Sequence, residues 1–477
     1  MSNQIHIIQN AITTTISEIF RGDFRRICEV KKAVLHLEAI YFCHGTCYLL
    51  KRENMPIKDQ LALYQRIELI PQSTTEFFEN NRECIINNWP EESALAAKPE
   101  ILYDALLASE FCVQPERVGY KIDKVSRDIA GAYYTSSDFS AQITYRALES
   151  YMDRKRRRAI DSDSFACCNE YENITFLDYS CGCGEFLLAV IQYFDNYVLG
   201  YSRKKLATQL RGVDVNPIAL MITIARIVSA VEAEDDENLL REVAKNFIVG
   251  NPLLHSDKIA PLEVRFDNFA LNRLYAETEG INCLELEQQN LVVLGNPPWE
   301  KLRFEEQAFF RPVCPAISAI SQKNKREKEI KKLAVNWLEL LEYYQLLQDD
   351  YASVKKEIPK HPLLKVSLVG ELNTYAMFAE LASRLTEKDG FAAIIVKSAL
   401  VTSTCYSSCF RHFVNQGSLS EVFLFDNREK LFQIDSREKF CVLFFGGEHA
   451  GGIKVHYGLT KHCLLYTSPS PRDRTRS

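Results

Sequence analysis

The sequence predicts an α/β fold, in which a sheet of seven strands follows an all-helical N-terminal region and is interrupted by a helical insertion. Three observations lead to this prediction. Residues 1–125 contain few glycines and repeat apolar residues at helical spacing. From residue 176 onward, seven short apolar runs end in Gly, Asp, Asn or Pro, and helical stretches separate the first five. Near-continuous apolar strands that alternate with helices are typical of a parallel sheet covered on both faces.

The composition indicates a large core and no dominant charge. Hydrophobic residues make up 47% of the 477 residues, charged residues make up 25%, and the formal net charge is −6. This charge argues against indiscriminate coating of nucleic acid but permits a local basic groove. No apolar run reaches the ~18–20 residues that cross a bilayer, and the first residues, MSNQIHIIQN, lack a signal-peptide pattern. We therefore expect a cytoplasmic protein without a membrane partner.

The 15 cysteines are expected to be reduced and mostly packed in the core. Their number is odd, they are scattered, and no secretion signal accompanies them. Their near-pairs do not form the CxxC…CxxC pattern of a zinc site. These near-pairs are Cys43/Cys47, Cys167/Cys168, Cys181/Cys183 and Cys405/Cys409. We therefore expect no metal site.

The N-terminal region, residues 1–125, is predicted to be all helical. Apolar residues recur at spacings of three and four in ICEVKKAVLHLEAIYFCHGTCYLL and in PEILYDALLASEFCV. Within the first of these stretches, Glu29-Val30-Lys31 has the E-x-K spacing of a metal-dependent nuclease. The nearest preceding acid, Asp23, is not on a recognisable strand, so a solvated helix face is the preferred interpretation.

The predicted strands and their connections occupy residues 126–450. The strands are FLDYS, LRGVDVN, NFIVGNP, LVVLGNPP, GFAAIIVKS, SEVFLFDN and KFCVLFFGG. In such sheets, ligands bind at the carboxyl ends of the strands, which is where the polar residues of these runs stand. A helical insertion of about residues 300–370 separates the fourth and fifth strands. Its aromatic residues are predicted to pack internally, and its lysines are either solvated or face a nucleic-acid backbone. The same two alternatives remain open for the basic run RKRRR, residues 154–158.

Three strand ends provide groups that suit a nucleoside ligand. The first strand ends at Asp178, and Gly182 and Gly184 then make a tight turn whose backbone N–H groups can approach a ligand closely. The second strand ends at Asp214, whose carboxylate can accept hydrogen bonds from both ribose hydroxyls. The third ends at Asn251, whose amide can read the edge of an adenine ring. The spacing does not fit the G-x-G-x-x-G of a nicotinamide enzyme.

The fourth strand ends in GNPPW, residues 295–299. Adjacent prolines stop a strand because each lacks a backbone N–H and fixes its own φ. They make a rigid corner, with the side-chain amide of Asn296 before it and the indole of Trp299 after it. This combination suits a flat, polar ligand such as a base.

Taken in order, these motifs resemble those of the N6-adenine DNA methyltransferases of restriction-modification and phage-defence systems, type IIG-like enzymes among them. DYSCGCGEF (178–186) is similar to their S-adenosylmethionine loop, D-P-x-C-G-S/T-G-x-F, and GNPPW (295–299) to their catalytic N/D-P-P-Y/F/W. GAYYTSSDFSAQ (131–142) resembles their upstream cofactor segment, and IDSREKFCVLFF (434–445) resembles the segment near the flipped base. The resemblance implies a Rossmann-like class I methyltransferase sheet of seven strands over residues 126–450.

The resemblance also implies that S-adenosyl-L-methionine is the cofactor and that no metal is needed. The residues expected to contact the cofactor are Tyr133, Thr135, Asp178, Cys181, Gly182, Gly184, Phe186, Asp214 and Asn251. The chain departs from the family pattern at Ser136, Tyr179 and Cys183, where Pro, Pro and Ser or Thr are usual. These departures bear on cofactor affinity rather than on the kind of site.

The implied reaction is methyl transfer to the N6 amine of an adenine flipped out of double-stranded DNA. Asn296 and the Pro297 carbonyl would accept both N6 hydrogens, which exposes the nitrogen lone pair for attack. Pro297 and Pro298 would hold these acceptors rigidly, and Trp299 would stack on the flipped base. Other restriction or defence subunits can be further partners.

Two alternatives remain open: an N-methyltransferase that acts on RNA or on a protein amide, and a catalytically weak DNA-binding fragment. The tail CLLYTSPSPRDRTRS, residues 463–477, changes composition abruptly, and its first part resembles the translated read-through of a sequencing adapter. We therefore expect a non-native tail on a chain truncated before its target-recognition domain. Weak or no sequence-specific methylation by residues 1–462 is the expected consequence.

Overall fold

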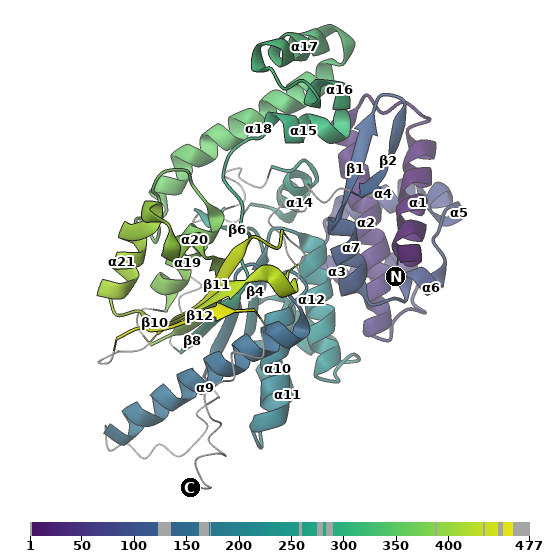
Figure 1. Cartoon of the computed structure of the whole chain (residues 1–477). Coiled ribbons are helices and arrows are strands. Elements are labelled where there is room, and N and C mark those ends of the chain that lie inside the picture. Colours follow the sequence, from purple (N-terminus) through teal and green to yellow (C-terminus); the bar gives the residue numbers. More distant parts are fainter. Residues whose placement is uncertain are drawn as a thin grey trace.

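The computed structural model describes residues 2–122, 135–161, 171, 173–256, 260–273, 280–282, 290–386, 389–432, 435–446 and 452–460. Its centre is an eight-stranded sheet with the order β12-β10-β11-β9-β8-β3-β4-β5 (Figure 1). The strands are β3 (Thr175–Asp178), β4 (Leu210–Asp214), β5 (Phe247–Val249), β8 (Leu291–Gly295), β9 (Phe391–Lys397), β10 (Leu419–Asp426), β11 (Lys439–Phe445) and β12 (Lys454–Leu459). The predicted α/β class is confirmed, and each of the seven predicted runs overlaps one of these strands, with β3 and β10 beginning one residue earlier.

Two details of the predicted sheet are wrong. The sheet is mixed rather than parallel, because β11 is antiparallel to both β9 and β10. β10 and β11 are consecutive strands that pair along their length as an antiparallel hairpin, without a crossover helix between them among the described residues. The sheet also has eight strands rather than seven, since β12 pairs in parallel with β10. The segment KVHYGL of β12 lacks an apolar run and exposes Val455 and Tyr457, as an edge strand does.

Helices cover the central strands, and every residue of β8 is buried. The helices α9 (Ser137–Asp161), α10 (Glu185–Tyr197) and α12 (Pro217–Ala230) pack side by side, and α19 (Thr374–Leu385) packs against β9. Arg154 of the basic run lies on α9 and donates to the carbonyl oxygens of Asp389 (2.6 Å) and Gly390 (2.8 Å), so it fixes the start of β9. Among the described helices, none combines the length and the apolar character needed to cross a membrane.

The N-terminal region is not all helical. An antiparallel hairpin, β1 (Ser109–Gln114) and β2 (Arg117–Ile122), follows its helices. The helices are α1 (Ser2–Ile19), α2 (Ile27–Leu49), α3 (Ile57–Arg66), α4 (Gln72–Asn80), α5 (Arg82–Asn87), α6 (Glu92–Leu95) and α7 (Pro99–Leu107). The prediction failed here because Phe111 and Val113 stand two residues apart between Glu110 and Gln114, which is the period of a strand, and Pro115 in the turn cannot continue a helix.

The E-x-K spacing noted in the sequence falls within a helix. Glu29 and Lys31 both lie in α2, and Glu29 forms an ion pair with Arg26 at 2.9 Å across one helical turn. Residues two apart on a helix point in different directions, so the two side chains do not form the paired arrangement that a strand would give them.

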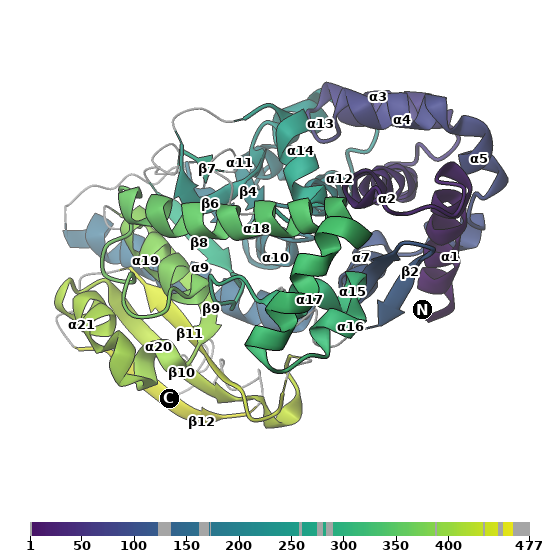
Figure 2. The same ribbon diagram turned by 90° about the horizontal axis from the view of Figure 1, so that it is seen from above.

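The helical insertion leaves the sheet after GNPPW and returns to the same place. Its helices are α15 (Glu306–Val313), α16 (Pro315–Ser318), α17 (Lys323–Asn336) and α18 (Leu338–Glu357). Lys301 and Asn373 pair as an antiparallel bridge at the base of the insertion. α17 lies at the top of Figure 1, and α18 overlies the central strands in the view from above (Figure 2). The chain bends at Trp337 (φ −160°, ψ 74°), whose indole Nε1 donates to the Arg25 carbonyl at 2.6 Å.

His361 fastens the end of the insertion to the segment after β5. It is 2% exposed, its Nδ1 accepts a hydrogen bond from the Leu363 N–H (3.1 Å), and its Nε2 donates to the Pro252 carbonyl (3.2 Å). A second proton on the ring would break the first of these contacts. Burial, with His255 close by, lowers the pKa of His361 to about 4.

His361→Gln is expected to reduce the pH dependence of stability. The folded-state pKa lies below the ordinary value of 6.5, so the unfolded state binds more protons between these values and stability falls as the pH is lowered through them. Between pH 7 and pH 5 this histidine accounts for about 2 kcal/mol of unfolding free energy. In urea denaturation, the unfolding free energy at pH 7 minus that at pH 5 should be smaller by that amount in the variant than in the unsubstituted chain. The exposed His6→Gln serves as control, and an unchanged difference in His361→Gln would contradict the prediction.

Candidate active site

The loop after β3 holds two glycines in left-handed backbone conformations. Gly182 has φ +50° and Gly184 has φ +84°, a region that other residues rarely adopt. A Cβ on Gly184 would lie 2.8 Å from Thr223 Cγ2. The Gly184 N–H donates to the Cys181 carbonyl at 2.8 Å. The loop is therefore tight, and α10 begins at Glu185 directly after it.

α12 braces this loop from behind, which the sequence motifs did not indicate. Thr223 Oγ1 donates to the Gly182 carbonyl at 2.6 Å. Arg226 donates to the Cys183 carbonyl and forms an ion pair with Glu185 at 2.7 Å. One signal was present: a Thr and an Arg stand three residues apart in the otherwise apolar helix PIALMITIARIVSA. This spacing places both side chains on one face.

Two carboxyl groups from strand ends flank the same loop. Asp178 accepts a hydrogen bond from the Ser180 N–H (3.0 Å), and Asp214 accepts from the N–H groups of Gly182 and Asn216 (2.9 Å each). Burial raises the pKa of Asp178 to about 8, against the Ser180 hydrogen bond and with help from Asp214. Burial also raises the pKa of Asp214, against its backbone hydrogen bonds. Two acids with raised pKa values on either side of one glycine loop make this loop a candidate functional site.

The end of β8 approaches Asp178 so closely that only glycine fits there. A Cβ on Gly295 would lie 2.7 Å from Asp178 Oδ1. β8 pairs with β3 in parallel, so the two strands end side by side. The GNPPW corner therefore starts directly beside the loop that follows Asp178.

Asn296 is bonded to the segment that precedes α9. Its Nδ2 donates to Thr135 Oγ1 at 3.1 Å, and Thr135 is buried. This contact joins two motifs that lie 161 residues apart in the chain. It places Thr135 at the proline corner, whereas the sequence predicted it as a cofactor contact. The neighbouring Tyr133 lies outside the described residues.

Thr374, which the sequence did not indicate, holds the other side of the corner. Its Oγ1 donates to the Pro298 carbonyl at 2.6 Å and accepts from the Glu300 N–H at 2.9 Å. Its own N–H donates to the Glu300 carbonyl at 3.0 Å. Thr374 is the first residue of α19, directly after the insertion. One hydroxyl therefore clamps the chain on both sides of Trp299, while Pro297 is buried within the corner.

Trp299 lies in the core, where the sequence predicted a stacking surface for a base. The indole is 4% exposed and its Nε1 donates to the Ile395 carbonyl at 3.4 Å. The ring packs against Phe432 and Phe440, with centroid distances of 5.4 and 6.1 Å. In this structure the indole anchors the corner to the hydrophobic core. Stacking on a base would require this aromatic cluster to open.

Cys181 and Phe186, which the sequence predicted as cofactor contacts, are buried, and so is Cys183 between them. The exposed fractions of Cys181, Cys183 and Phe186 are 5%, 6% and 3%. Burial raises the pKa of both thiols. The two cysteines are therefore neutral packing groups that shape the loop, and neither is a nucleophile at neutral pH.

Asn251 lies near the end of β4 but does not end a strand. β5 stops at Val249, and the Gly250 N–H donates to the Asp214 carbonyl at 2.9 Å. Asn251 begins β6 (Asn251–His255), which pairs with β7 (Gly280–Ile281). Its Oδ1 accepts a hydrogen bond from the Leu253 N–H at 3.0 Å. The predicted strand end is displaced by two residues, although the chain does bring Asn251 close to Asp214.

The N-terminal region contributes Tyr103 of α7 to this site. Asn216 Nδ2 donates to Tyr103 Oη at 2.6 Å, and Asn216 Oδ1 caps α12 by accepting from the Ile218 N–H at 3.0 Å. Burial and the nearby Asp214 raise the pKa of Tyr103, so the phenol stays neutral. No local sequence signal indicates this contact, because it depends on the packing of α2 and α7 against α12.

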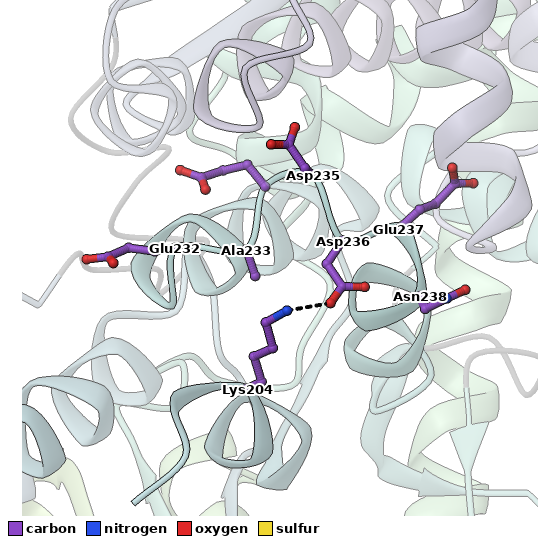
Figure 3. Close-up of a pocket in the computed structure, with 8 residues that line it drawn as sticks. Lys204, Glu232, Ala233, Asp235, Asp236, Glu237 and Asn238 are labelled. Atoms are coloured by element: carbon purple, nitrogen blue, oxygen red, sulfur yellow. Dashed lines mark hydrogen bonds and ion pairs between the residues drawn. The ribbon is translucent and has the colours of Figure 1, made fainter.

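A depression at the other end of α12 is acidic (Figure 3). Residues 232–238 line it together with Lys204, which pairs with Asp236 at 2.7 Å. Asp236 also caps α13 (Glu237–Ala244) by accepting from the Leu239 N–H. α12 is 14 residues long, or about 20 Å, so this depression is distant from the strand ends. Its carboxylates would repel a nucleic-acid backbone, and we assign no ligand to it.

Comparisons with known proteins give weak likenesses only. No family model matches the chain, and no curated protein matches it. The chain is similar to the DrdV–DNA complex, with a TM-score of 0.49, 13% identity, and coverage of 98% of this chain and 44% of that one. It is also similar to a nuclease-deletion mutant of the Type ISP restriction-modification enzyme LlaGI in complex with a DNA substrate mimic. The TM-score is 0.48, the identity is 14%, and the match covers 97% of this chain and 36% of that one. A third likeness is to the Type IIL restriction-modification enzyme MmeI in complex with DNA. The TM-score is 0.42, the identity is 12%, and the match covers 95% of this chain and 59% of that one.

The chain spans less than two thirds of each of these three proteins. Scores and identities of this size do not establish a common function. The functional argument therefore depends on the residues of the chain itself.

Proposed function

We propose that the chain transfers a methyl group from S-adenosyl-L-methionine to the N6 amine of adenine in DNA, as the modification part of a restriction-modification or phage-defence system. One observation carries the proposal. The glycine loop after Asp178 and the corner at Asn296 follow adjacent, hydrogen-bonded strands and approach each other at Gly295. A cofactor loop and a base-binding corner must lie this close if a methyl group is to pass between them.

The loop offers what a nucleoside-containing cofactor needs. Gly182 and Gly184 permit close approach to the backbone, and the Asp214 carboxylate at the end of β4 would bind the ribose hydroxyls. When bound, S-adenosyl-L-methionine supplies an activated methyl group at this edge of the sheet. The residues proposed to contact it are Tyr133, Thr135, Asp178, Cys181, Gly182, Gly184, Phe186, Asp214 and Asn251.

The corner offers two oxygen acceptors for the N6 amine of a flipped adenine, the Asn296 side chain and the Pro297 carbonyl. Accepting both N6 hydrogens withdraws the nitrogen lone pair from the ring and makes it a better nucleophile. Thr135 fixes the orientation of the Asn296 amide by accepting from its Nδ2. The two prolines restrict the backbone. The acceptors are therefore preorganised, which is how electrostatic catalysis avoids reorganisation during the reaction.

Nucleoside mass spectrometry tests the proposed reaction directly. The purified chain is incubated with S-adenosyl-L-methionine and a mixed-sequence plasmid free of methyladenine, and the DNA is then digested. N6-methyladenine that depends on the cofactor is the expected product. N4-methylcytosine would overturn the proposal. Little or no sequence-specific methylation is expected of residues 1–462 alone, so the second informative result, the absence of any methylated base from a chain that binds the cofactor, does not by itself decide the acceptor. In the second case, the same assay on RNA and on protein tests the other acceptors.

Thr374→Val is expected to lower the methylation rate about ten-fold or more, whereas Thr374→Ser keeps most of it. Valine has the shape of threonine but leaves the Pro298 carbonyl and the Glu300 N–H without their hydroxyl partner. A ten-fold lower rate corresponds to an activation free energy that is higher by ~1.4 kcal/mol, because the corner is no longer held in position. Serine retains the hydroxyl. Initial rates are measured together with the dissociation constant of the cofactor. A lower rate with unchanged cofactor affinity would locate the effect at the corner, and equal rates for Val and Ser would count against the clamp.

A further inference from the structure

We propose that the outward face of α17 binds the phosphate backbone of duplex DNA. This inference rests on the proposed function, because the outward face of α17 is the surface that would hold the duplex while a flipped base lies in the GNPPW corner. The face consists of Lys325, Lys328, Lys331 and Lys332, all exposed. We call this set the lysine face.

The lysine face lies opposite the buried side of α17. The buried side is formed by Arg326, Ile330 and Leu333. At about 3.6 residues per turn, the centre of the opposite side falls near Lys328. The two acidic residues of the helix, Glu327 and Glu329, lie towards its flanks. The helix therefore separates a side that packs from an exposed side on which the four lysines lie with the uncharged Asn324 and Val335.

This face is positive in a protein that is negative overall. The 14 residues of α17 contain six basic and two acidic side chains, a net charge of +4, whereas the whole chain carries −6. Lys332 pairs with Glu329, but no ion pair among the described residues involves Lys325, Lys328 or Lys331. A helix face that serves only solubility usually mixes both signs.

The lysine face has a fixed direction because α17 is anchored near both ends. Arg326 forms an ion pair with Glu306 of α15, which also accepts a hydrogen bond from the Tyr344 hydroxyl at 2.5 Å. Trp337, directly after α17, donates to the Arg25 carbonyl at 2.6 Å. These contacts connect the helix to the rest of the insertion and to the N-terminal region. The lysines are therefore presented on a rigid support.

A duplex backbone matches this face. DNA carries one negative charge per about 1.7 Å of helix axis, and the distance from Lys325 to Lys331 along the helix is about 9 Å. An enzyme that extrudes a base must hold the duplex beyond that base, and phosphate contacts fix its position without reading sequence. The insertion that carries α17 starts directly after the GNPPW corner, and its other helices connect α17, at the top of Figure 1, to the base of the insertion at Lys301 and Asn373.

The test measures how the affinity for a fluorescent mixed-sequence DNA duplex depends on salt. The full chain is compared with the triple variant Lys325→Gln, Lys328→Gln and Lys331→Gln. A control triple variant, Lys58→Gln, Lys98→Gln and Lys245→Gln, removes the same charge from exposed positions elsewhere. Each lost phosphate contact flattens the slope of log K against log salt by about 0.9. We expect the α17 variant to lose about 2–3 from the slope and the control variant to keep the slope of the unsubstituted chain.

Three outcomes would overturn the proposal: equal slopes for the two triple variants, no duplex binding by the unsubstituted chain, or a slope change seen with RNA duplexes but not with DNA. The single variant Lys328→Gln, with an expected change of about 0.9, keeps the test valid if the triple variant does not fold. Cofactor binding by the same proteins is measured separately. Failure to bind S-adenosyl-L-methionine would count against the proposed function, whereas the DNA-binding result would stand on its own.

Discussion

Asn296→Ala is expected to lower the rate of N6-methyladenine formation at least about 100-fold, with little change in the affinity for S-adenosyl-L-methionine. The Asn296 oxygen is proposed to accept a hydrogen from the reacting amine, and the loss of one preorganised group at a reaction centre typically costs 10²–10³ in rate. The Asn296 side chain donates to Thr135 Oγ1, on the segment before α9, whereas the glycine loop is braced by Thr223 and Arg226 of α12. The cofactor loop should therefore keep its conformation in the variant.

Two further variants make this prediction specific. Asn238→Ala changes an exposed asparagine on α13 and should leave the rate unchanged. Asn296→Asp keeps an acceptor oxygen but loses the Nδ2 donor to Thr135, so an intermediate rate is expected. The rates come from mass spectrometry of digested DNA, and the affinities from calorimetry. If Asn296→Ala weakened cofactor binding as much as it lowered the rate, Asn296 would belong to the cofactor pocket and the proposed role would be wrong.

The buried strands of the sheet could be predicted because burial on both faces leaves a continuous apolar run. β8, with LVVLG buried throughout, is the clearest example. The same signal is missing in β12, an edge strand whose Tyr457 is 81% exposed. The hairpin of β1 and β2 was missed for a different reason: its apolar residues follow a helix directly, and the change of period occurs within a few residues. Edge and hairpin strands owe their stability to pairing partners that lie elsewhere in the chain.

The residues of the candidate site also fall into two groups: those that the sequence indicated and those that it did not. Asp178, Gly184 and Asn296 were found because each belongs to a short segment whose geometry is local, namely a strand end, a tight turn and a proline corner. Tyr103 and Thr374 were not found, because their contacts depend on how the N-terminal region and the insertion pack against the sheet. Local chemistry is therefore readable from local sequence, whereas the residues that support it are supplied by tertiary packing.

Trp299 illustrates this limit within one motif. Its position after two prolines predicts an aromatic plane at a rigid corner that stacks on a flipped base. Its burial is decided by Phe432 and Phe440, which reach it from the segment around β11. The corner is therefore held by the core through its indole and by Thr374 through its backbone, and Asn296 is the polar side chain that it presents towards Thr135.

Gly295→Ala is expected to destabilise the fold by about 2–4 kcal/mol and to weaken cofactor binding. The added Cβ would lie 2.7 Å from Asp178 Oδ1 and 3.1 Å from its Cγ. That carboxyl group is buried and held by the Ser180 N–H, so it cannot move without loss. Either β8 separates from β3 or Asp178 leaves its position. Both outcomes disturb the loop that would hold the cofactor.

Gly417→Ala separates the cost of backbone conformation from the cost of the clash. Gly417 has φ +64°, and among the described residues no atom lies within 4 Å of a Cβ placed there. Its substitution should cost only the conformational part, about 1 kcal/mol. In urea denaturation, Gly295→Ala should therefore lose about 1–3 kcal/mol more than Gly417→Ala. Equal losses of unfolding free energy in the two variants would show that the ends of β8 and β3 can accommodate a Cβ at residue 295. In that case the close approach of the corner to Asp178, on which the proposed methyl transfer depends, would not be enforced by packing.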